Sequence, residues 1–226
     1  MLIFCPLRLI VIQDRLYLLV SILYGSEAIM PPSRRDELVD AAMRIFYRNG
    51  FHNTGLDQIQ KESGISKMTL YNHFKSKDEL IVAALRRRDE MFRNNLMKFV
   101  ETQSKDSTER ILAVFDALDA WFNEDTFNGC MFINASAEYC DPDCPARRVA
   151  AEHKLEIIRY IQELCIAAKL DNPEELAQQL YVLIEGSIVV AHLVGRVSNN
   201  SHLLSDSAHR AKRMAAGLIE NARQGS

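Results

Sequence analysis

The chain has 226 residues, of which 48% are hydrophobic and 25% charged, a composition that excludes a disordered protein and predicts a packed core. The length allows one small module joined to a larger one, or a single domain with a substantial core. The formal net charge of −3 indicates neither a nucleic-acid nor a membrane partner, so the distribution of charge along the chain is more informative.

The charge is uneven along the sequence. Residues 30–100 contain 13 lysines and arginines against 9 acidic residues, whereas residues 101–226 contain 12 against 19. A basic front part and an acidic back part are the pattern expected of a protein in which only the N-terminal part faces phosphates.

The first 29 residues form an unusual, largely apolar segment that Arg8, Asp14 and Arg15 interrupt. No uncharged run there approaches the roughly 18 to 20 residues that span a bilayer, and no clean export signal with a cleavage site is present. Three interpretations remain: a mis-assigned start with true initiation at Met30, an added helix or strand that docks on the body, or a membrane-associated tail. We expect the first and treat residues 1–29 as an uncertain extension.

Three short helices are predicted next by apolar residues at three- and four-residue spacing: 34–48, 56–62 and 67–72. Gly50 and Gly64 follow the first two helices, and glycine readily adopts the left-handed conformation that ends a helix. Ser66 precedes the third helix as its N-cap.

A long helix follows, opened by the capping box S-x-x-E at Ser76 and Glu79 and running towards Val100. Later helices are predicted by the same spacing: 108–123, 127–138, 146–169, 174–197 and 206–222. Asn172 and Pro173 suit a helix start, as N-cap and first helical residue.

The predicted fold class is all-α, because no strand-like alternation is sustained from Ser33 onward. Residues 30–78 are expected to form an N-terminal three-helix domain containing a helix-turn-helix. Residues 79–226 are expected to form a larger helical domain behind it.

The junction of the second and third helices describes a helix-turn-helix, in which Gly64 permits the tight turn. The free N–H groups that open the third helix favour phosphate, and short side chains there can approach base edges. Donors, cations and aromatic rings are interleaved over this stretch: Ser66, Lys67, Thr69, Tyr71, Asn72, His73, Lys75 and Lys77. Short helix-glycine-helix units also occur in other helical proteins, and Met68 or Tyr71 could pack inward instead.

The stretches 41–54 and 64–80, with Ile59 between them, closely resemble the DNA-binding signature of the TetR/AcrR family of bacterial regulators. The motifs A-x-x-x-F-x-x-x-G-F-x-x-T and L-Y-x-H-F-x-S-K-x-x-L stand in register. The resemblance implies a homodimer, an all-α effector-binding and dimerisation domain over 79–226, and repression that a small molecule relieves.

The same resemblance assigns roles within the helix-turn-helix. Four residues would mainly hold phosphates: Thr54, Tyr71, His73 and Lys77. Four would lie nearest the bases: Lys67, Met68, Thr69 and Asn72. Many family members carry a small residue where Met68 stands, and this methionine either limits how closely the backbone nears the groove or contacts a thymine methyl. Asn72 could bond adenine or a phosphate.

By family analogy, the last two predicted helices form the four-helix bundle of the dimer. Their apolar faces contain the expected interface residues: Leu180, Ile184, Ser187, Ile188, Ala191, Ala211, Ala215 and Leu218. A single chain can bury such faces too, so an intramolecular core is the alternative. Two-fold pairing would place two recognition helices about 34 Å apart along one face of the duplex.

The candidate effector pocket is rich in aromatic residues and methionine, which favours an apolar or aromatic small-molecule ligand. Its expected lining is Met97, Phe115, Trp121, Phe122, Phe127, Cys130, Met131, Phe132, Tyr139 and His153. An aromatic stripe at helical spacing is also typical of a plain hydrophobic core.

The five cysteines are odd in number and irregularly spaced, which favours a reducing, cytoplasmic location over a disulfide framework. The segment Gly129-Cys130 resembles one in a branch of the family whose members sense electrophiles or oxidants, so a repressor switched by modification of Cys130 is the alternative to a ligand-switched one. A buried free cysteine is also a common small hydrophobe. Cys140 and Cys144 could form a disulfide or, with His153, share zinc, but a fourth ligand is missing and we expect no metal.

An enzyme and a pure protein-interaction module are the rival classes. The sequence contains no glycine-rich phosphate loop, no G-x-S-x-G, no H-E-x-x-H and no acidic cluster of convincing metal spacing. Neither rival class explains why donors, cations and aromatic rings are combined over residues 67–77. We therefore predict a non-enzymatic regulator that needs no cofactor and binds no membrane, with three partners: double-stranded operator DNA, a second copy of itself and a small-molecule effector.

Overall fold

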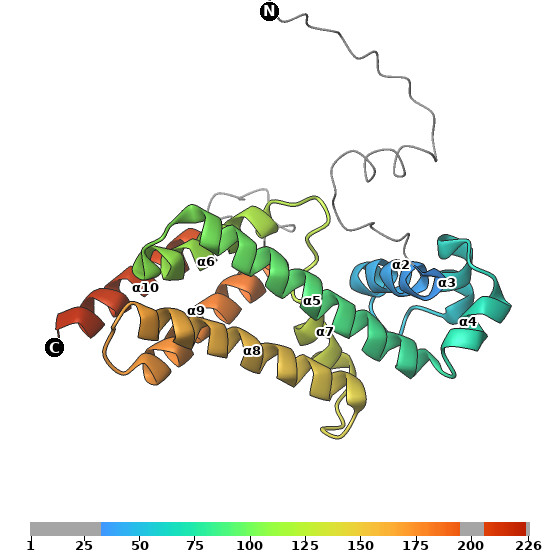
Figure 1. Ribbon diagram of the computed structural model, residues 1–226. Helices are drawn as coiled ribbons and strands as arrows, with labels where there is room; N and C mark the ends of the chain where they lie inside the picture. The colour runs from blue at the N-terminus through green and yellow to red at the C-terminus, as the bar shows by residue number, and fades with distance from the viewer. Residues whose placement is uncertain (1–32, 195–205, 225–226) are drawn as a thin grey trace, which may run out of the picture. The chain divides into compact units, whose positions relative to one another are not determined.

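The computed structural model describes residues 33–194 and 206–224 (Figure 1). Within those ranges the chain forms helices and no strand, which confirms the predicted all-α fold. The helices are α2 (Arg34–Asn49), α3 (Leu56–Ser63), α4 (Lys67–His73), α5 (Lys77–Gln103), α6 (Ser107–Phe122), α7 (Met131–Glu138), α8 (Pro145–Ala167), α9 (Pro173–Val194) and α10 (Ser207–Gln224). The extension 1–29 and the end of the helix predicted to reach residue 197 lie outside the described residues.

α2, α3 and α4 pack against one another around a small apolar core. Leu38 and Phe46 of α2 meet Ile59 of α3, Leu70 of α4 and the following Phe74, all of them buried. Full burial of each such side chain contributes roughly 2 kcal/mol to stability. This core fixes which faces of α3 and α4 remain at the surface.

α5 is a single long helix that crosses the predicted domain boundary between residues 78 and 79. Ser76 caps it, its Oγ accepting the N–H of Glu79 at 3.2 Å, while the Glu79 carboxylate accepts the N–H of Lys75 at 2.8 Å. The capping box is therefore shifted by one residue from its usual reciprocal form. α5 packs on α2 and also on α6 and α8, so it links the helix-turn-helix to the helices behind it.

α6, α8, α9 and α10 form the body behind the helix-turn-helix. α9 packs between α8 and α10, and α10 also packs on α6. One continuous cluster of buried apolar residues extends from α2 to α10. The predicted domains therefore share one core among the described residues.

α7 begins at Met131, and the prediction that this helix starts at Phe127 is wrong. Gly129 has a φ of +75°, in the left-handed region, which breaks the helix before it. The hydroxyl of Tyr47 on α2 accepts the N–H of Asn128 at 2.8 Å and donates to the carbonyl of Gly129 at 2.9 Å. A helix starting at Phe127 would use the Gly129 carbonyl for its own hydrogen bond, whereas here that carbonyl accepts the Tyr47 hydroxyl.

Candidate nucleic-acid interface

The turn between α3 and α4 has the geometry that its sequence predicts. Gly64 has a φ of +68° and donates its N–H to the carbonyl of Gln60, closing α3. Ser66 then opens α4, and its Oγ accepts the N–H of Thr69 at 3.1 Å and lies 2.8 Å from the Thr69 hydroxyl. Because the cap occupies both side chains, Ser66 and Thr69 stabilise the start of α4.

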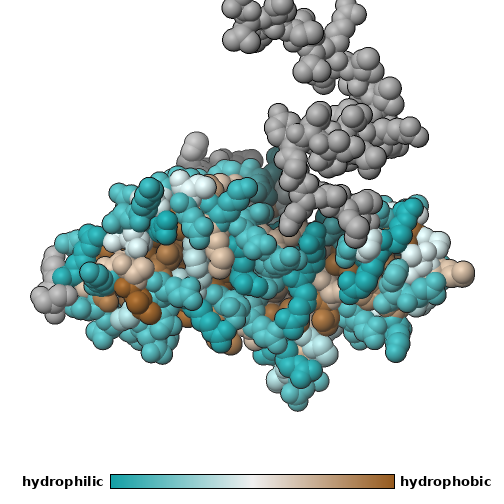
Figure 2. All heavy atoms as spheres, viewed as in Figure 1, coloured by the Kyte–Doolittle hydropathy of each residue, from teal (hydrophilic) through white to brown (hydrophobic). Residues whose placement is uncertain are grey.

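α4 buries one face and exposes the other. Leu70 is 2% exposed, whereas Met68 is 73% and Tyr71 50% exposed, so the alternative in which these two pack inward is wrong. The molecular face shown in Figure 2 is largely hydrophilic, with apolar residues in small patches. The exposed set on α4 is Lys67, Met68, Tyr71, Asn72 and His73.

Two residues expected to hold phosphates are engaged within the chain. Thr54 is fully buried, and its hydroxyl donates to the carbonyl of Gly50 at 2.7 Å. Lys77 is half-buried, with its Nζ 3.4 Å from the carbonyl of His52. The expectation for Thr54 is therefore corrected, because its hydroxyl satisfies a carbonyl at the end of α2 and offers nothing to DNA in this conformation.

Lys67 is held in place by a surface ion pair with α3. Its Nζ donates to Oδ1 of Asp57 at 2.9 Å. The hydrogen bond to Asp57 and the charge of that carboxylate both raise the pKa of Lys67. Both side chains are well exposed, so the pair contributes little stability.

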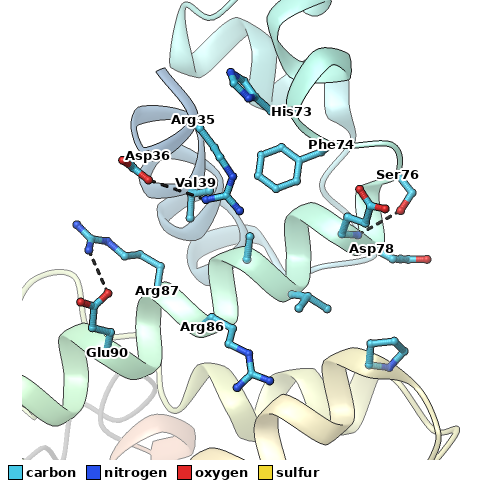
Figure 3. A pocket seen from close by; sticks show the side chains of 14 residues that line it. Arg35, Asp36, Val39, His73, Phe74, Ser76, Asp78, Arg86, Arg87 and Glu90 are labelled. Carbon is cyan, nitrogen blue, oxygen red and sulfur yellow. Dashed lines mark hydrogen bonds and ion pairs between the residues drawn. The ribbon is translucent and has the colours of Figure 1, made fainter. Parts of the chain in front are cut away.

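A cleft of about 910 Å³ borders the end of α4, as Figure 3 shows. On one side, the Arg35 guanidinium lies 5.1 Å from the ring centroid of Phe74, near His73. The sequence did not point to Arg35, because no local pattern indicates that it contacts Phe74, which lies far away in the chain. The lining contains both basic and acidic side chains, so the cleft offers phosphate no clear excess of positive charge. These side chains are Arg35, Asp36, His73, Asp78, Glu79, Arg86, Arg87 and Glu90.

Comparison with known proteins identifies this architecture. Residues 38–84 match the family model described as bacterial regulatory proteins, tetR family. Over 186 residues the chain is 32% identical to the HTH-type transcriptional activator FasR of Mycolicibacterium smegmatis. The matched region covers 82% of this chain and 67% of FasR. The chain belongs to the TetR family. It is accordingly a DNA-binding transcriptional regulator.

Two further relatives show that the similarity extends well beyond the helix-turn-helix. The HTH-type transcriptional repressor NemR of Escherichia coli is 26% identical over 191 residues, covering 80% of this chain and 94% of NemR. The crystal structure of a TetR-family transcriptional regulator from Streptomyces coelicolor superimposes with a TM-score of 0.72 at 28% identity, covering 83% of this chain and 95% of the other. The body behind α4 is therefore also of the TetR type.

In this TetR-family regulator, half of the predicted pocket residues line one internal cavity: Trp121, Cys130, Met131, Phe132 and His153. Its volume is about 20 Å³, enough for about one water molecule. The other half lie outside that lining: Met97, Phe115, Phe122, Phe127 and Tyr139. The aromatic stripe is therefore mainly core, and an aromatic ligand requires these side chains to move apart.

Charged groups that sequence reasoning missed also border the cavity. The Nζ of Lys154 on α8 donates to both oxygens of Glu185 on α9, at 2.7 and 2.6 Å, and to the Sγ of Cys130 at 3.3 Å. The guanidinium of Arg88 lies 4.8 Å from the ring centroid of Tyr47 in the helix-turn-helix. Helical spacing marks an apolar face, but it cannot reveal which charges on different helices become partners.

His153 is buried beside Asp89 of α5. Its Nδ1 lies 2.8 Å from Asp89 Oδ1, and its ring stacks on Phe132 with centroids 3.7 Å apart. Arg93 donates to both Asp89 oxygens. Burial opposes ionisation of Asp89, but hydrogen bonds from His153 and Arg93 outweigh it and hold the Asp89 pKa well below its usual range. Burial lowers the pKa of His153.

The zinc site considered for three residues is not assembled. Cys140 and Cys144 are free thiols at or near the surface, while His153 is buried. Within residues 33–194 and 206–224, no three histidine, cysteine or acidic side chains lie together as metal ligands.

The residues expected at the dimer interface lie mostly inside the chain's own core. Of the eight, only Leu218 is partly exposed. The other seven are buried: Leu180, Ile184, Ser187, Ile188, Ala191, Ala211 and Ala215. Ile184 and Ile188 line the internal cavity, and the Ser187 hydroxyl donates to the carbonyl of Ile184 at 2.7 Å. The physical reason is that α8 and α10 cover this face of α9, while α9 and α6 cover the matching face of α10.

Other apolar side chains of the same helices remain exposed: Val182, Val189, Val190 and Leu193 on α9 and Met214 on α10. Of the helices that the structure describes, α9 alone has the length and apolar content of a membrane span, and core helices of soluble proteins meet the same criterion. An exposed apolar strip of this kind, flanking a packed helix pair, is a candidate protein contact.

Proposed function

We propose that this TetR-family regulator is a homodimeric repressor that places one α4 in the major groove at each half of a palindromic operator. The observation that carries this proposal is the exposed face of α4, which combines Lys67, Tyr71 and Asn72 on a helix fixed from behind by Leu70. A helix presented in this way matches the docking geometry of helix-turn-helix proteins. As a bacterial DNA-binding protein, it would act in the cytoplasm.

Within α4, we assign base contacts to Lys67, Met68 and Asn72, and phosphate contacts to Tyr71 and His73. Met68 is the most exposed of the large apolar residues among those described, which suits contact with a thymine methyl. Thr69 is engaged in the cap, so its role is to hold α4 in place.

The proposed dimer forms through the exposed strip on α9 and α10. Val182, Val189 and Leu193 stand seven and four residues apart, so they share one face of α9. Met214 adds an exposed apolar side chain on α10. Residues 79–226 would thus carry dimerisation and signal reception, and residues 30–78 DNA reading.

The direction of regulation depends on where the operator lies relative to the promoter. Among the relatives, NemR is named a repressor and FasR an activator. We propose repression, in which the bound dimer blocks access to the promoter. A reporter gene behind the operator would then show more expression in a deletion strain, and lower expression in that strain would favour activation.

Operator binding is tested by selecting bound sequences from a random DNA library with the full chain. We expect a palindrome whose half-sites recur at one helical turn or a multiple of it. Gel shifts with that sequence should weaken steeply as salt rises, because several phosphates are contacted. A selected sequence without two-fold symmetry, or binding insensitive to salt, contradicts the proposal.

The first candidate for the release signal is an apolar or aromatic small molecule that enters between α5, α8 and α9. The walls of the cavity support it, since they are mainly apolar, with Trp121 and Phe132 among them. Such a ligand must widen the cavity, and this widening is what would move α5 and the attached helix-turn-helix. A thermal-shift screen of neutral aromatic compounds should find stabilisers that also release the operator.

A second candidate is oxidation of Cys130, which two observations favour. Its thiol lines the cavity, and the ammonium of Lys154 lies 3.3 Å from its Sγ. The thiolate attacks one oxygen of hydrogen peroxide, the O–O bond breaks, and the leaving hydroxide takes up a proton to form water. Cys130 becomes a sulfenic acid.

Cys130→Ser tests this candidate, with Cys165→Ser as the matched control. Cys165 is also buried, and burial raises the pKa of its thiol to about 11, so it should stay inert. Hydrogen peroxide should release the operator from the wild type and from Cys165→Ser, and should leave Cys130→Ser bound. Release that persists in Cys130→Ser excludes the cysteine switch.

A further inference from the structure

The carboxylate of Glu138, the last residue of α7, binds the turn that joins α2 to α3. Its Oε1 accepts the backbone N–H of Phe51 at 2.9 Å, and its Oε2 accepts that of His52 at 2.6 Å. The imidazole Nδ1 of His52 lies 3.0 Å from the same Oε2. One side chain of α7 therefore holds two backbone groups of the helix-turn-helix.

The turn is shaped to receive this carboxylate. Gly50 has a φ of +83°, and a Cβ placed there would lie 3.1 Å from Oε1 of Glu138, so glycine keeps the approach open. Tyr139 packs against Phe51 and His52, with ring centroids 6.1 and 4.9 Å apart. Since Phe51 and His52 belong to no helix, the carboxylate provides the acceptor that their N–H groups need.

The other end of α7 leads to the internal cavity and is tied to α2. Cys130 immediately precedes α7 and lines the cavity, and Tyr47 of α2 bonds Asn128 and Gly129 just before it. Between its ends, α7 packs along α8 and also contacts α5 (Figure 1). α7 thus spans the distance from the cavity to the turn that Glu138 holds.

We propose that Glu138 is a positioning residue for operator binding, which sets the orientation of α4 relative to α9 and α10. This inference rests on the proposed function, because it requires two copies of α4 held at the separation of two half-sites. Hydrogen bonds to an ionised carboxylate are short and strong, and two of them fix a turn in direction as well as distance. Without them, α4 keeps its own cap and core, but each helix-turn-helix swings more freely about the start of α5.

The experiment uses the full chain with Glu138→Ala and Glu138→Gln. Glu152→Gln is the matched control, because Glu152 is an exposed carboxylate of α8 that pairs with Arg86. His52→Ala removes the imidazole and leaves both backbone bonds to Glu138 available. Fluorescence anisotropy measures binding to three DNAs: the palindrome selected by the wild type, the same palindrome with one base pair inserted between its halves, and a single half-site.

We expect both Glu138 variants to bind the palindrome about tenfold more weakly than the wild type, the equivalent of one charge-assisted hydrogen bond. Their half-site binding should be unchanged, because α4 itself is intact. The preference of the wild type for the palindrome over the inserted sequence should largely disappear in both variants. Glu152→Gln and His52→Ala should retain that preference.

Two results overturn the inference. A parallel loss on the half-site and the palindrome indicates a role in folding alone, and an unchanged preference for spacing shows that Glu138 does not position α4. If Glu138→Ala fails to fold, Glu138→Gln, which keeps one acceptor oxygen, decides between these outcomes. In either case the proposed function stands as long as the wild type binds the palindrome, and it fails if the wild type does not.

Discussion

The surface of α4 and the interface of α8 with α9 use similar side chains in opposite surroundings. On the surface, the Lys67–Asp57 pair joins side chains that are 57% and 83% exposed. In the interior, the Lys154–Glu185 pair joins side chains that are 20% and 23% exposed. Water already solvates the surface charges, so they are free to exchange partners, whereas the interior charges depend on one another. The first arrangement suits recognition of another molecule, and the second suits a fixed fold.

The largest effect on assembly and DNA binding is expected from acidic substitutions in the exposed apolar strip of α9. Val182→Glu with Leu193→Glu should convert the dimer to monomers, because four carboxylates would meet across the interface. Loss of the second binding module should weaken palindrome binding by about a thousandfold. Sedimentation and anisotropy measure the two effects. Leu155→Glu, at an exposed apolar position on α8, should change neither, and a variant that stays dimeric would place the interface elsewhere.

The second prediction compares an interior carboxylate with a surface one. Asp89→Ala should lower the free energy of unfolding by about 3 kcal/mol, because it leaves buried His153 without its partner and Arg93 without a counter-charge. Asp57→Ala should change that free energy by less than about 0.5 kcal/mol. Urea denaturation measures both. Equal losses would remove the distinction between the two regions.

The third prediction concerns the surface pair and operator binding. Lys67→Ala should weaken binding about tenfold, because it removes a contact with the edge of a base. Asp57→Ala should instead tighten binding by a few-fold, since it frees Lys67 and removes a repulsive charge. Fluorescence anisotropy measures both affinities, with Lys98→Ala, near the far end of α5, as a control. Changes of the same sign in both variants would contradict an exchangeable pair.

The smallest effect is expected from the titration of His153. Its pKa is lower in the folded chain than in the unfolded chain, so the unfolded state binds the proton first and stability falls as the pH drops below about 6.5. The depressed pKa of Asp89 adds a further loss only below about pH 4. His153→Gln cannot titrate, so its melting temperature should fall less between about pH 7 and pH 5. An identical pH profile would place the sensitivity in another group.

Local features of the sequence were sufficient to predict most helices. The caps at Ser66 and Ser76 and the left-handed Gly64 depend on residues within a few positions of each other, and the structure places all three as expected. The start of α7 was mispredicted because Asn128 and Gly129 are bound by Tyr47, about eighty residues earlier. The spacing of apolar residues does not indicate that a distant hydroxyl, here that of Tyr47, will bind these backbone groups.

The sequence by itself determined the family, the all-α fold and the position of the helix-turn-helix, because a helix-turn-helix is built from contacts within a short stretch. Only the tertiary structure decided that Thr54 is buried, that Ile184 and Ile188 belong to the core, and that Glu138 grips the turn after α2. Those outcomes depend on which helix faces meet. The packing of the whole chain decides which faces meet. A periodic apolar pattern indicates that one face of a helix is buried, but not which helix packs against it.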